Sequence, residues 1–274
     1  MTGRADLHTH TTASDGMLKP SELVALAAKE GLQVLAVTDH DTTEGVGEAL
    51  ERSQDFSLTT VPGVELNART PHGEAHILGY FVRHDDPVLV GRLAERRGAR
   101  DQRGEAIVRR LAELGYQLSW SRVLDIAEGG SVGRPHVARA LVEAGYVPDV
   151  DGAFRSLIGK GAPAYIPTPS LAAEEAVRWV LEAGGLPVLA HPLHVLQALP
   201  SLRRAGLVGM EVYYGAYTAE EIAMLARVAT QEGLLQTGGT DFHGNEVMAT
   251  VGLGSAPLPW EHVERLLEYE RARS

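Results

Sequence analysis

The chain has 274 residues, of which 44% are hydrophobic, and this is enough for one large α/β domain or for one domain that carries an insertion. Its formal charge of −11 argues against broad, sequence-independent binding of nucleic acid, duplex DNA included, because such binding needs many Lys and Arg side chains. The absence of cysteine excludes disulfides, thiolate zinc sites and thiol nucleophiles, so imidazole and carboxylate groups would have to hold any metal ion.

Targeting and membrane segments are not evident in the sequence. The first residues, "MTGRADLHTH", contain no apolar run long enough for a secretory signal, and no later stretch is long enough for a membrane span. We therefore expect a soluble, cytoplasmic protein without a membrane partner. The sequence does not indicate the oligomeric state.

Short apolar runs typical of buried strands alternate with amphipathic helical patterns along most of the chain. The first helix is expected to begin at Pro20, since proline suits the first helical turn, and to be capped by Gly31. Such alternation predicts parallel βα units. The expected strands are residues 5–8, 33–38, 58–66, 76–82, 186–190, 209–213 and 234–238.

The strand pattern disappears from about residue 88 to residue 165, and helical patterns replace it around residues 106–116, 120–130, 134–146 and 150–163. We interpret this part as a helical insertion. The expected organisation is a first barrel part, a helical substrate-recognition subdomain and a second barrel part, with boundaries at 1–90, 91–165 and 166–274. Prolines, and not Gly/Ser runs, lie near both boundaries, so the parts should pack closely.

Polar side chains of the kind that bind metals stand where the expected strands end. His8 and His10 lie two residues apart, so a strand would point both to one side, where they can converge on one ion. Similar groups recur in "TDHD", "GVELN", "AHILGY", "AHP" and "GTDFHG". Because the strand ends of a parallel α/β barrel converge on one active site, we expect these groups to meet.

Together with "DLHTHTTASDG", these motifs resemble, in the same order along almost the whole chain, the PHP (polymerase and histidinol phosphatase) superfamily of metal-dependent phosphoesterases. The resemblance implies a distorted seven-stranded β/α (TIM-like) barrel with a helical insertion subdomain. It also implies a site for three divalent metal ions, and imidazole and carboxylate ligands suit Mn, Fe or Zn.

The resemblance further implies a set of metal ligands, in which one glutamate bridges two ions. The implied ligands are His8, His10, Glu65 and Asp241 for the first ion, Glu65 with His76 and His191 for the second, and Asp15, His40 and His243 for the third.

Other acids lie beside these motifs. Asp6 faces the same side of its strand as His8, so it could accept a hydrogen bond from a ligating imidazole, or it could be an ordinary strand-end acid. The same alternatives apply to Asp39 and Asp41. Glu211, at another expected strand end, could act in the site or only pack beside it.

Clustered cations with bridging carboxylates suit the hydrolysis of phosphate esters, because paired ions activate water and neutralise the attacking and leaving oxygens. Neither a Gly-x-Ser-x-Gly elbow nor a Walker loop is present, so no protein nucleophile is indicated. The candidate catalytic residues are Asp15, through an ion that would orient the phosphate, and His194, which could assist the leaving oxygen or line the pocket.

The expected insertion contains "VGRPHVAR" and "LIGKGAPAY", in which Arg134, His136 and Lys160 stand beside glycines. This arrangement suits a second phosphate of the substrate, although an ordinary helix start with solvated cations would have the same pattern. The arginine-rich stretch at residues 92–111 is interpreted as a solvated helix face, with Arg100 or Arg103 as the exceptions.

Both insertion motifs resemble the branch of nucleoside 3′,5′-bisphosphate phosphatases, some of which are also 5′ to 3′ exoribonucleases on short RNA. We therefore expect hydrolysis of the 3′-phosphate of such bisphosphates, with trimming of short 5′-phosphorylated RNA as a further activity. Histidinol-phosphate hydrolysis is an alternative with the same metal core. A non-catalytic metal-binding PHP module is an alternative of another class.

Overall fold

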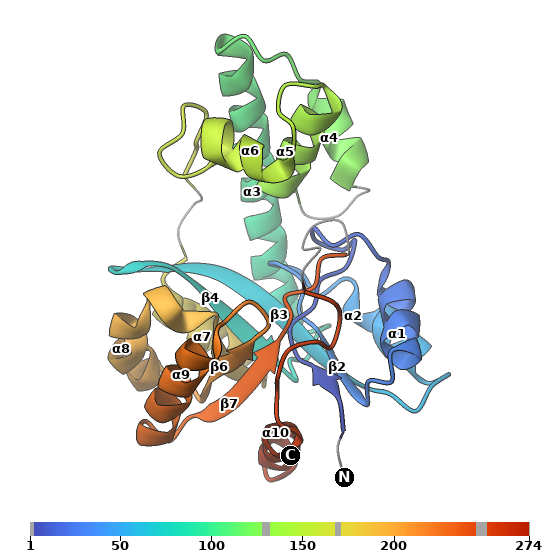
Figure 1. The fold of residues 1–274 in the computed structure, drawn as a ribbon, viewed down its shortest axis with the longest axis vertical. Helices are drawn as coiled ribbons and strands as arrows, with labels where there is room; N and C mark the ends of the chain where they lie inside the picture. Colours follow the sequence, from blue (N-terminus) through green and yellow to red (C-terminus); the bar gives the residue numbers. More distant parts are fainter. Residues whose placement is uncertain (1–2, 128–131, 168–170, 245–250, 274) are drawn as a thin grey trace.

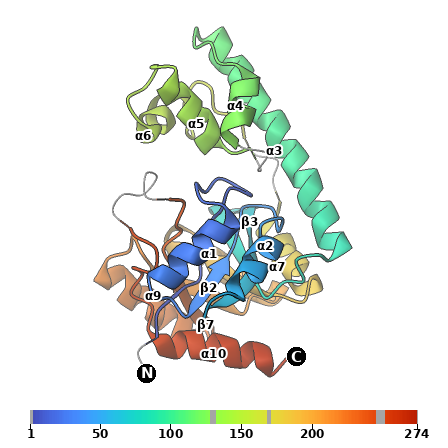
Figure 2. The same cartoon turned by 90° about the vertical axis from the view of Figure 1, so that its right-hand side faces the viewer.

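The computed structural model describes residues 3–127, 132–167, 171–244 and 251–273. A sheet that curls into a barrel forms the lower body, and a group of helices stands above it on the long helix α3 (Pro87–Glu113) (Figures 1 and 2). Residues 128–130, the end of one expected helix, lie outside the described residues.

The strands pair in the order of the sequence, from β1 to β7. The first and last strands also meet, because the Leu7 amide donates to the Gly238 carbonyl at 3.2 Å and Thr9 bridges to Phe242. The expected seven-stranded α/β barrel is thus confirmed. Its strands are β1 (Ala5–Asp6), β2 (Val34–Val37), β3 (Thr59–Thr70), β4 (Gly73–Tyr80), β5 (Leu186–Ala190), β6 (Gly209–Tyr214) and β7 (Leu235–Gly239).

The sheet is mixed, because β4 runs antiparallel to both β3 and β5. The expectation of parallel βα units throughout was wrong at this strand. Only Pro71 and His72 connect β3 to β4, whereas a parallel crossover needs about a dozen residues or more.

Helices cover the outside of the barrel. Helix α1 begins at Pro20, as predicted, and Gly31 beyond its end has a φ of +76°, a conformation that glycine adopts at little cost. Helix α10 closes the lower end of the barrel (Figure 1), where Val263 and Leu266 pack against the barrel core. These helices are α1 (Pro20–Lys29), α2 (Val46–Ser53), α7 (Ala173–Glu182), α8 (Leu199–Ala205), α9 (Ala219–Gln231) and α10 (Trp260–Arg271).

The upper helices have an apolar core of their own, which includes Ile107, Leu141 and Ile158. Among the described residues, no helix is long and apolar enough to cross a membrane. The boundaries expected for the insertion and the two barrel parts stay predictions. Besides α3, this region contains α4 (Trp120–Ala127), α5 (Arg134–Glu143), α6 (Val150–Ala153) and the π-helical turn η1 (Phe154–Ile158).

Ion pairs and hydrogen bonds fasten the upper helices to the upper rim of the barrel. From α3, Arg96 Nε and Arg100 Nε donate to the Asp41 carboxylate at 3.0 and 2.8 Å, and Arg139 from α5 donates to the Asp15 carbonyl at 2.9 Å. Burial alone would raise the pKa of Asp41, but Arg100 and Arg96 outweigh it and lower that pKa. The charged carboxylate therefore holds α3 over the strand ends.

Candidate metal centre

Nine acidic and imidazole side chains meet at the end of the barrel that faces the upper helices. We call them the floor. Glu65 and His76 lie within β3 and β4, and the other seven lie in the loops that follow β1, β2, β5 and β7, so residues far apart in the sequence become neighbours. The floor consists of His8, His10, Asp15, His40, Glu65, His76, His191, Asp241 and His243.

One group on the floor is formed by His8, His10, Glu65 and Asp241, whose ligand-type atoms all lie within 4.8 Å of one another. Asp241 Oδ1 lies 3.3 Å from His8 Nε2 and 3.0 Å from His10 Nε2. Glu65 Oε2 lies 3.3 and 3.2 Å from the same two nitrogens. This is a compact set of two imidazoles and two carboxylates, as a borderline divalent cation prefers.

Glu65 also contacts a second group through its other oxygen. Its Oε1 lies 2.7 Å from His76 Nδ1 and 3.3 Å from His191 Nε2, while Oε2 lies 2.9 Å from His40 Nδ1. A carboxylate with imidazoles on both oxygens has the geometry of a bridging ligand.

A third group contains Asp15, His40 and His243, together with His10, again within 4.8 Å. His243 Nε2 lies 3.2 Å from Asp15 Oδ1, and the His10 and His243 rings stack with centroids 4.1 Å apart. The sequence did not indicate that His10 would stand between two groups.

A buried polar atom normally has a hydrogen-bond partner. Within the part of the chain that the structure describes, several floor atoms are buried and have no hydrogen bond of acceptable geometry: His8 Nε2, both ring nitrogens of His10, Asp15 Oδ1 and Glu65 Oε2. All of them are ligand atoms for divalent cations, and they point toward one another. The floor residues therefore fit metal ions.

The electrostatics of the floor agree with this fit. Burial opposes ionisation of Glu65, but His40, His8 and His76 hold its pKa well below the usual range. Burial also opposes a charge on His10, but the close Asp241 and Glu65 carboxylates raise its pKa to about 10. Metal ions would bind with release of protons from such imidazoles.

Asp6 does not bond an imidazole, although the sequence left that role open. Its carboxylate accepts from the backbone amides of Thr240 at 3.0 Å and Gly254 at 2.8 Å, so it holds the loops after β7 in place. Glu211 contacts the His8 imidazole instead, because its Oε1 lies 3.1 Å from His8 Nδ1.

Asp39 shapes the loop that carries Asp15. It accepts hydrogen bonds from the Thr11 amide at 2.7 Å and from Ser14 Oγ at 2.6 Å. At Gly16 the backbone turns so tightly that a Cβ atom would lie 2.5 Å from the His10 carbonyl oxygen. The loop therefore folds back, and Asp15 returns to the floor.

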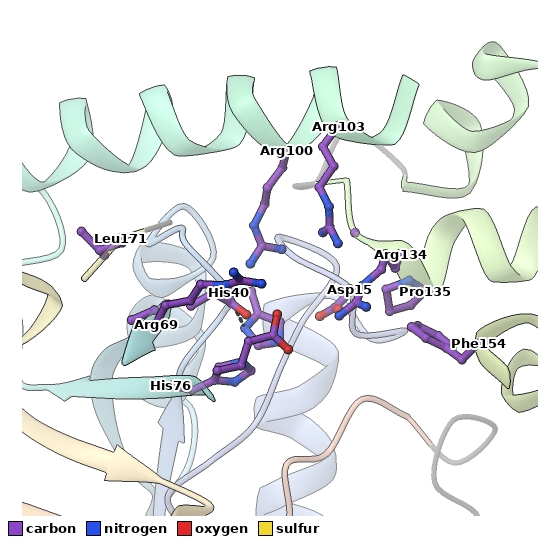
Figure 3. Close-up of a pocket in the computed structure, with 14 residues that line it drawn as sticks. Asp15, His40, Arg69, His76, Arg100, Arg103, Arg134, Pro135, Phe154 and Leu171 are labelled. Carbon is purple, nitrogen blue, oxygen red and sulfur yellow. Dashed lines mark hydrogen bonds between the residues drawn. The ribbon is translucent and has the colours of Figure 1, made fainter. Parts of the chain in front are cut away.

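A pocket opens above the floor, and arginines form its other side. Figure 3 shows Arg100 and Arg103 extending from the helix above toward His40 and Asp15. The sequence named both as possible exceptions to a solvated helix face. The sequence did not indicate Arg69, which lies near the end of β3 and belongs to none of the recognised motifs. We call Arg69, Arg100, Arg103 and Arg134 the roof.

Within the described ranges, not every hydrogen-bond donor of the Arg103 guanidinium group has a partner. Its Nε donates to the Ile166 carbonyl at 2.8 Å, whereas its buried Nη2 has no hydrogen-bond partner among the described residues. Burial, together with Arg134 and Arg100, lowers its pKa to about 10. An anion in the pocket would satisfy this donor and relieve the repulsion between the guanidinium groups.

Arg134 begins α5 and is held by two aromatic rings. Its guanidinium carbon lies 5.4 Å from the centre of the Phe154 ring and 5.9 Å from that of Tyr165, within the range of cation–π interactions. A Cβ atom at the neighbouring Gly133 would lie 3.6 Å from Asp15 Oδ2, so the start of α5 lies directly against the floor.

The remaining predicted substrate residues lie elsewhere. His136 Nδ1 accepts from the Gly133 amide at 2.9 Å, and burial lowers its pKa to about 4, so it closes the first turn of α5 as a neutral group. Lys160 and His194 are exposed, and neither is among the described residues that line the pocket. Their predicted roles stay predictions.

The PHP-domain family model matches residues 6–119. The 5′-3′ exoribonuclease Rnm of Salmonella typhimurium is 34% identical to this chain, and the match covers 96% of this chain and 88% of that protein. The chain belongs to the PHP family. The expectation of a metal-dependent phosphoesterase, a hydrolase, is thereby confirmed.

Other known proteins are similar at comparable identity. A 3′,5′-nucleoside bisphosphate phosphatase of Chromobacterium violaceum is 30% identical, with coverage of 94% of this chain and 96% of that protein. A phosphoribosyl 1,2-cyclic phosphate 1,2-diphosphodiesterase of Eggerthella lenta is 35% identical, with coverage of 87% and 94%. A solved structure from Bifidobacterium adolescentis, assigned as a metal-dependent phosphoesterase, matches with a TM-score of 0.89 at 33% identity and covers 97% of this chain and 96% of its own.

Proposed function

We propose that this PHP-family enzyme removes the 3′-phosphate from nucleoside 3′,5′-bisphosphates. The observation that supports this most strongly is the opposition of floor and roof across one pocket. Among the described residues, buried oxygen and imidazole nitrogen atoms on the floor have no hydrogen-bond partner, and neither does a buried arginine nitrogen on the roof. A substrate with two phosphates satisfies both sides. The similarity to a relative named for this activity agrees with the proposal.

In this proposal the floor holds three divalent ions, Mn, Fe or Zn, with the ligand sets given above. When bound, the ions supply positive charge that polarises the phosphoester and lowers the pKa of water. Glu65 links the ligand sets, and Asp15 lies at the side of the floor nearest α5. Asp15 thus faces both the scissile phosphate and the roof.

The roof binds the second phosphate in this proposal. Arg103 offers its free Nη2, and Arg134 is pre-positioned between Phe154 and Tyr165, so little side-chain freedom is lost on binding. The pocket has a volume of about 210 Å³, which is less than the roughly 300–1,000 Å³ typical of small-molecule sites. A site of this size suits a small nucleotide better than a duplex. We keep a cytoplasmic location as a prediction.

Trimming of short 5′-phosphorylated RNA is a second candidate, which the Rnm relative favours. The roof would then hold the 5′-phosphate of the chain while the floor meets the first phosphodiester. Histidinol phosphate is a weaker candidate, because its cationic amine would meet the arginines Arg69, Arg103 and Arg134.

The test compares phosphate release by the metal-loaded protein from adenosine 3′,5′-bisphosphate, histidinol phosphate and an aryl phosphate. We expect the highest kcat/KM for the bisphosphate. The Arg134→Ala variant should lose this preference and keep its aryl phosphatase activity, because only the bisphosphate reaches the roof.

The possible failures are distinct. No release from the bisphosphate by an enzyme that hydrolyses the aryl phosphate would refute the substrate. No release from any ester by metal-loaded protein would favour a non-catalytic module. A 5′-phosphorylated oligoribonucleotide, assayed in parallel, separates the phosphatase from the exoribonuclease.

A further inference from the structure

Glu211 is a completely buried carboxylate in β6, on the inside of the barrel beneath the floor. It is not one of the nine proposed ligands, and the mechanism above does not use it. A buried acid is costly unless its oxygens are well bonded, so its partners indicate what it does.

Both oxygens of Glu211 bond floor residues. Oε1 lies 3.1 Å from His8 Nδ1, and Oε2 accepts the backbone N–H of His191 at 2.8 Å. His8 follows β1 and His191 follows β5, so one carboxylate connects two strand ends that lie on different sides of the barrel. The two residues also belong to different ligand sets.

The contact with His8 selects one protonation form of the ring. A carboxylate oxygen accepts hydrogen bonds, so the contact with Glu211 Oε1 assigns the hydrogen to Nδ1 of His8. In the neutral imidazole this leaves the lone pair on Nε2. Nε2 is the atom that faces Glu65 Oε2 and Asp241 Oδ1, both at 3.3 Å.

The contact with His191 holds a strained backbone. His191 has φ of 27° and ψ of 59°, in the left-handed region that residues other than glycine adopt only where the surroundings impose it. The hydrogen bond to Glu211 Oε2 fixes the amide at this turn and thereby directs the side chain toward Glu65.

We propose that Glu211 is a positioning residue that prepares two metal ligands at once, by fixing the tautomer of His8 and the backbone turn of His191. The inference rests on the ligand set in the proposed function. It does not depend on which phosphoester the enzyme hydrolyses.

Glu211→Gln is the sharpest substitution, because it changes neither size nor shape. Glutamine has one acceptor oxygen and one donor NH₂, so it cannot accept from both His8 Nδ1 and the His191 amide. If its oxygen stays on His191, its NH₂ meets His8 Nδ1 and forces the hydrogen onto Nε2. If the side-chain amide is flipped, its NH₂ group faces the His191 amide, which then loses its acceptor. Either arrangement disturbs one ligand.

The experiment measures Zn²⁺ affinity by competition with a chelator, without any substrate. We expect Glu211→Gln to weaken at least one Zn²⁺ site about 10–100-fold, as changes to the partners of ligating histidines do. Tyr80→Phe is the matched control, since it removes a buried oxygen from the same barrel interior. It should change Zn²⁺ affinity less than about twofold.

Thermal unfolding of the metal-free proteins separates a loss of ligand positioning from a loss of overall stability. Only the second would lower the melting temperature strongly. Wild-type affinity in Glu211→Gln would overturn the inference, and so would an equal loss of affinity in Tyr80→Phe. If Glu211→Gln does not fold, nitrogen-15 NMR of Zn²⁺-loaded wild-type protein decides, because the inference requires the His8 proton on Nδ1 and a proton on Nε2 would refute it.

The outcome is distinguishable from failure of the proposed function. Wild-type protein that binds no Zn²⁺ would refute the ligand set and this inference together. Wild-type protein that binds Zn²⁺ and does not hydrolyse the bisphosphate would refute only the substrate.

Discussion

The floor and the roof of the pocket are built in different ways. The floor is made of residues in strands, and in the loops after them, whose order in the barrel follows their order in the sequence. Apart from one arginine in β3, the roof comes from the middle of a 27-residue helix and from the start of α5, so its position depends on how the upper helices dock. The topology of the barrel brings the floor residues to one end, with local hydrogen bonds of Asp39 and Glu211. The roof instead needs contacts between elements, such as those of Arg96 and Arg100 with Asp41.

The two regions also suit ligands of opposite charge. The buried floor atoms without a hydrogen-bond partner among the described residues are ligand atoms for cations, whereas the buried Nη2 of Arg103 is a donor suited to an anion. In the proposed function, the metal-loaded floor binds one phosphate of the substrate and the roof binds the other. Changes in the floor should therefore reduce turnover of every ester, while changes in the roof should reduce only substrates with a second phosphate.

The largest effect is expected in the floor. Asp241→Asn removes a charge that contacts both His8 and His10, so kcat should fall about a thousandfold for the bisphosphate and for an aryl phosphate, since metal ions contribute several kcal/mol and ~1.4 kcal/mol is a factor of ten. Steady-state assays measure it, with thermal unfolding as the control for folding. Near-normal turnover would contradict the role of Asp241.

The second effect concerns the stability of the protein and depends on His136 in α5, the helix that begins with Arg134. The folded protein holds the pKa of His136 at about 4, below its ordinary value of 6.5, so the unfolded chain binds a proton first as pH falls. The free energy of unfolding should therefore fall by about 3 kcal/mol between pH 6.5 and 4 through this group alone. The loss is complete only below the folded pKa.

His136→Asn is the variant that isolates this group, because its side-chain oxygen can replace Nδ1 as acceptor for the Gly133 amide. Urea unfolding of both proteins at several pH values measures the slopes. A shallower decline in the variant is expected, and parallel curves would show that His136 is not kept neutral.

The third effect tests the selectivity of the roof. Arg103→Ala should lower kcat/KM for the bisphosphate about 10–100-fold, because a charged hydrogen bond contributes roughly 1.5–3 kcal/mol, and should leave the aryl phosphate unchanged. Arg109→Ala, on the exposed side of the same helix, is the matched control. Equal losses for both substrates would mean that Arg103 acts on the floor.

The smallest effect is expected at Lys160 and His194, which the sequence placed in the site and the structure leaves exposed. Substitution of either by Ala should change kcat/KM by less than about twofold, as is usual for exposed positions. A tenfold loss in steady-state assays would confirm the role that the sequence predicted.

The sequence by itself predicted the nine floor residues, because their motifs lie near expected strand ends and resemble those of the PHP family, and the structure brings these side chains together. It also determined the first helix, through Pro20 and Gly31. It determined the presence of helices between β4 and β5, since no alternating pattern occurs there. Family membership followed from the same motifs.

Only the tertiary structure decided how side chains from separate elements meet. The alternation of a strand gives the side to which a residue points and not the neighbour that it meets, so Glu211, and not Asp6, bonds the His8 imidazole. Helical spacing shows which residues share a face, but the docking of α3 decides that Arg100 and Arg103 turn inward. For the same reason Lys160 and His194, beside suggestive motifs, face solvent: their surroundings depend on contacts between elements, which local sequence does not encode.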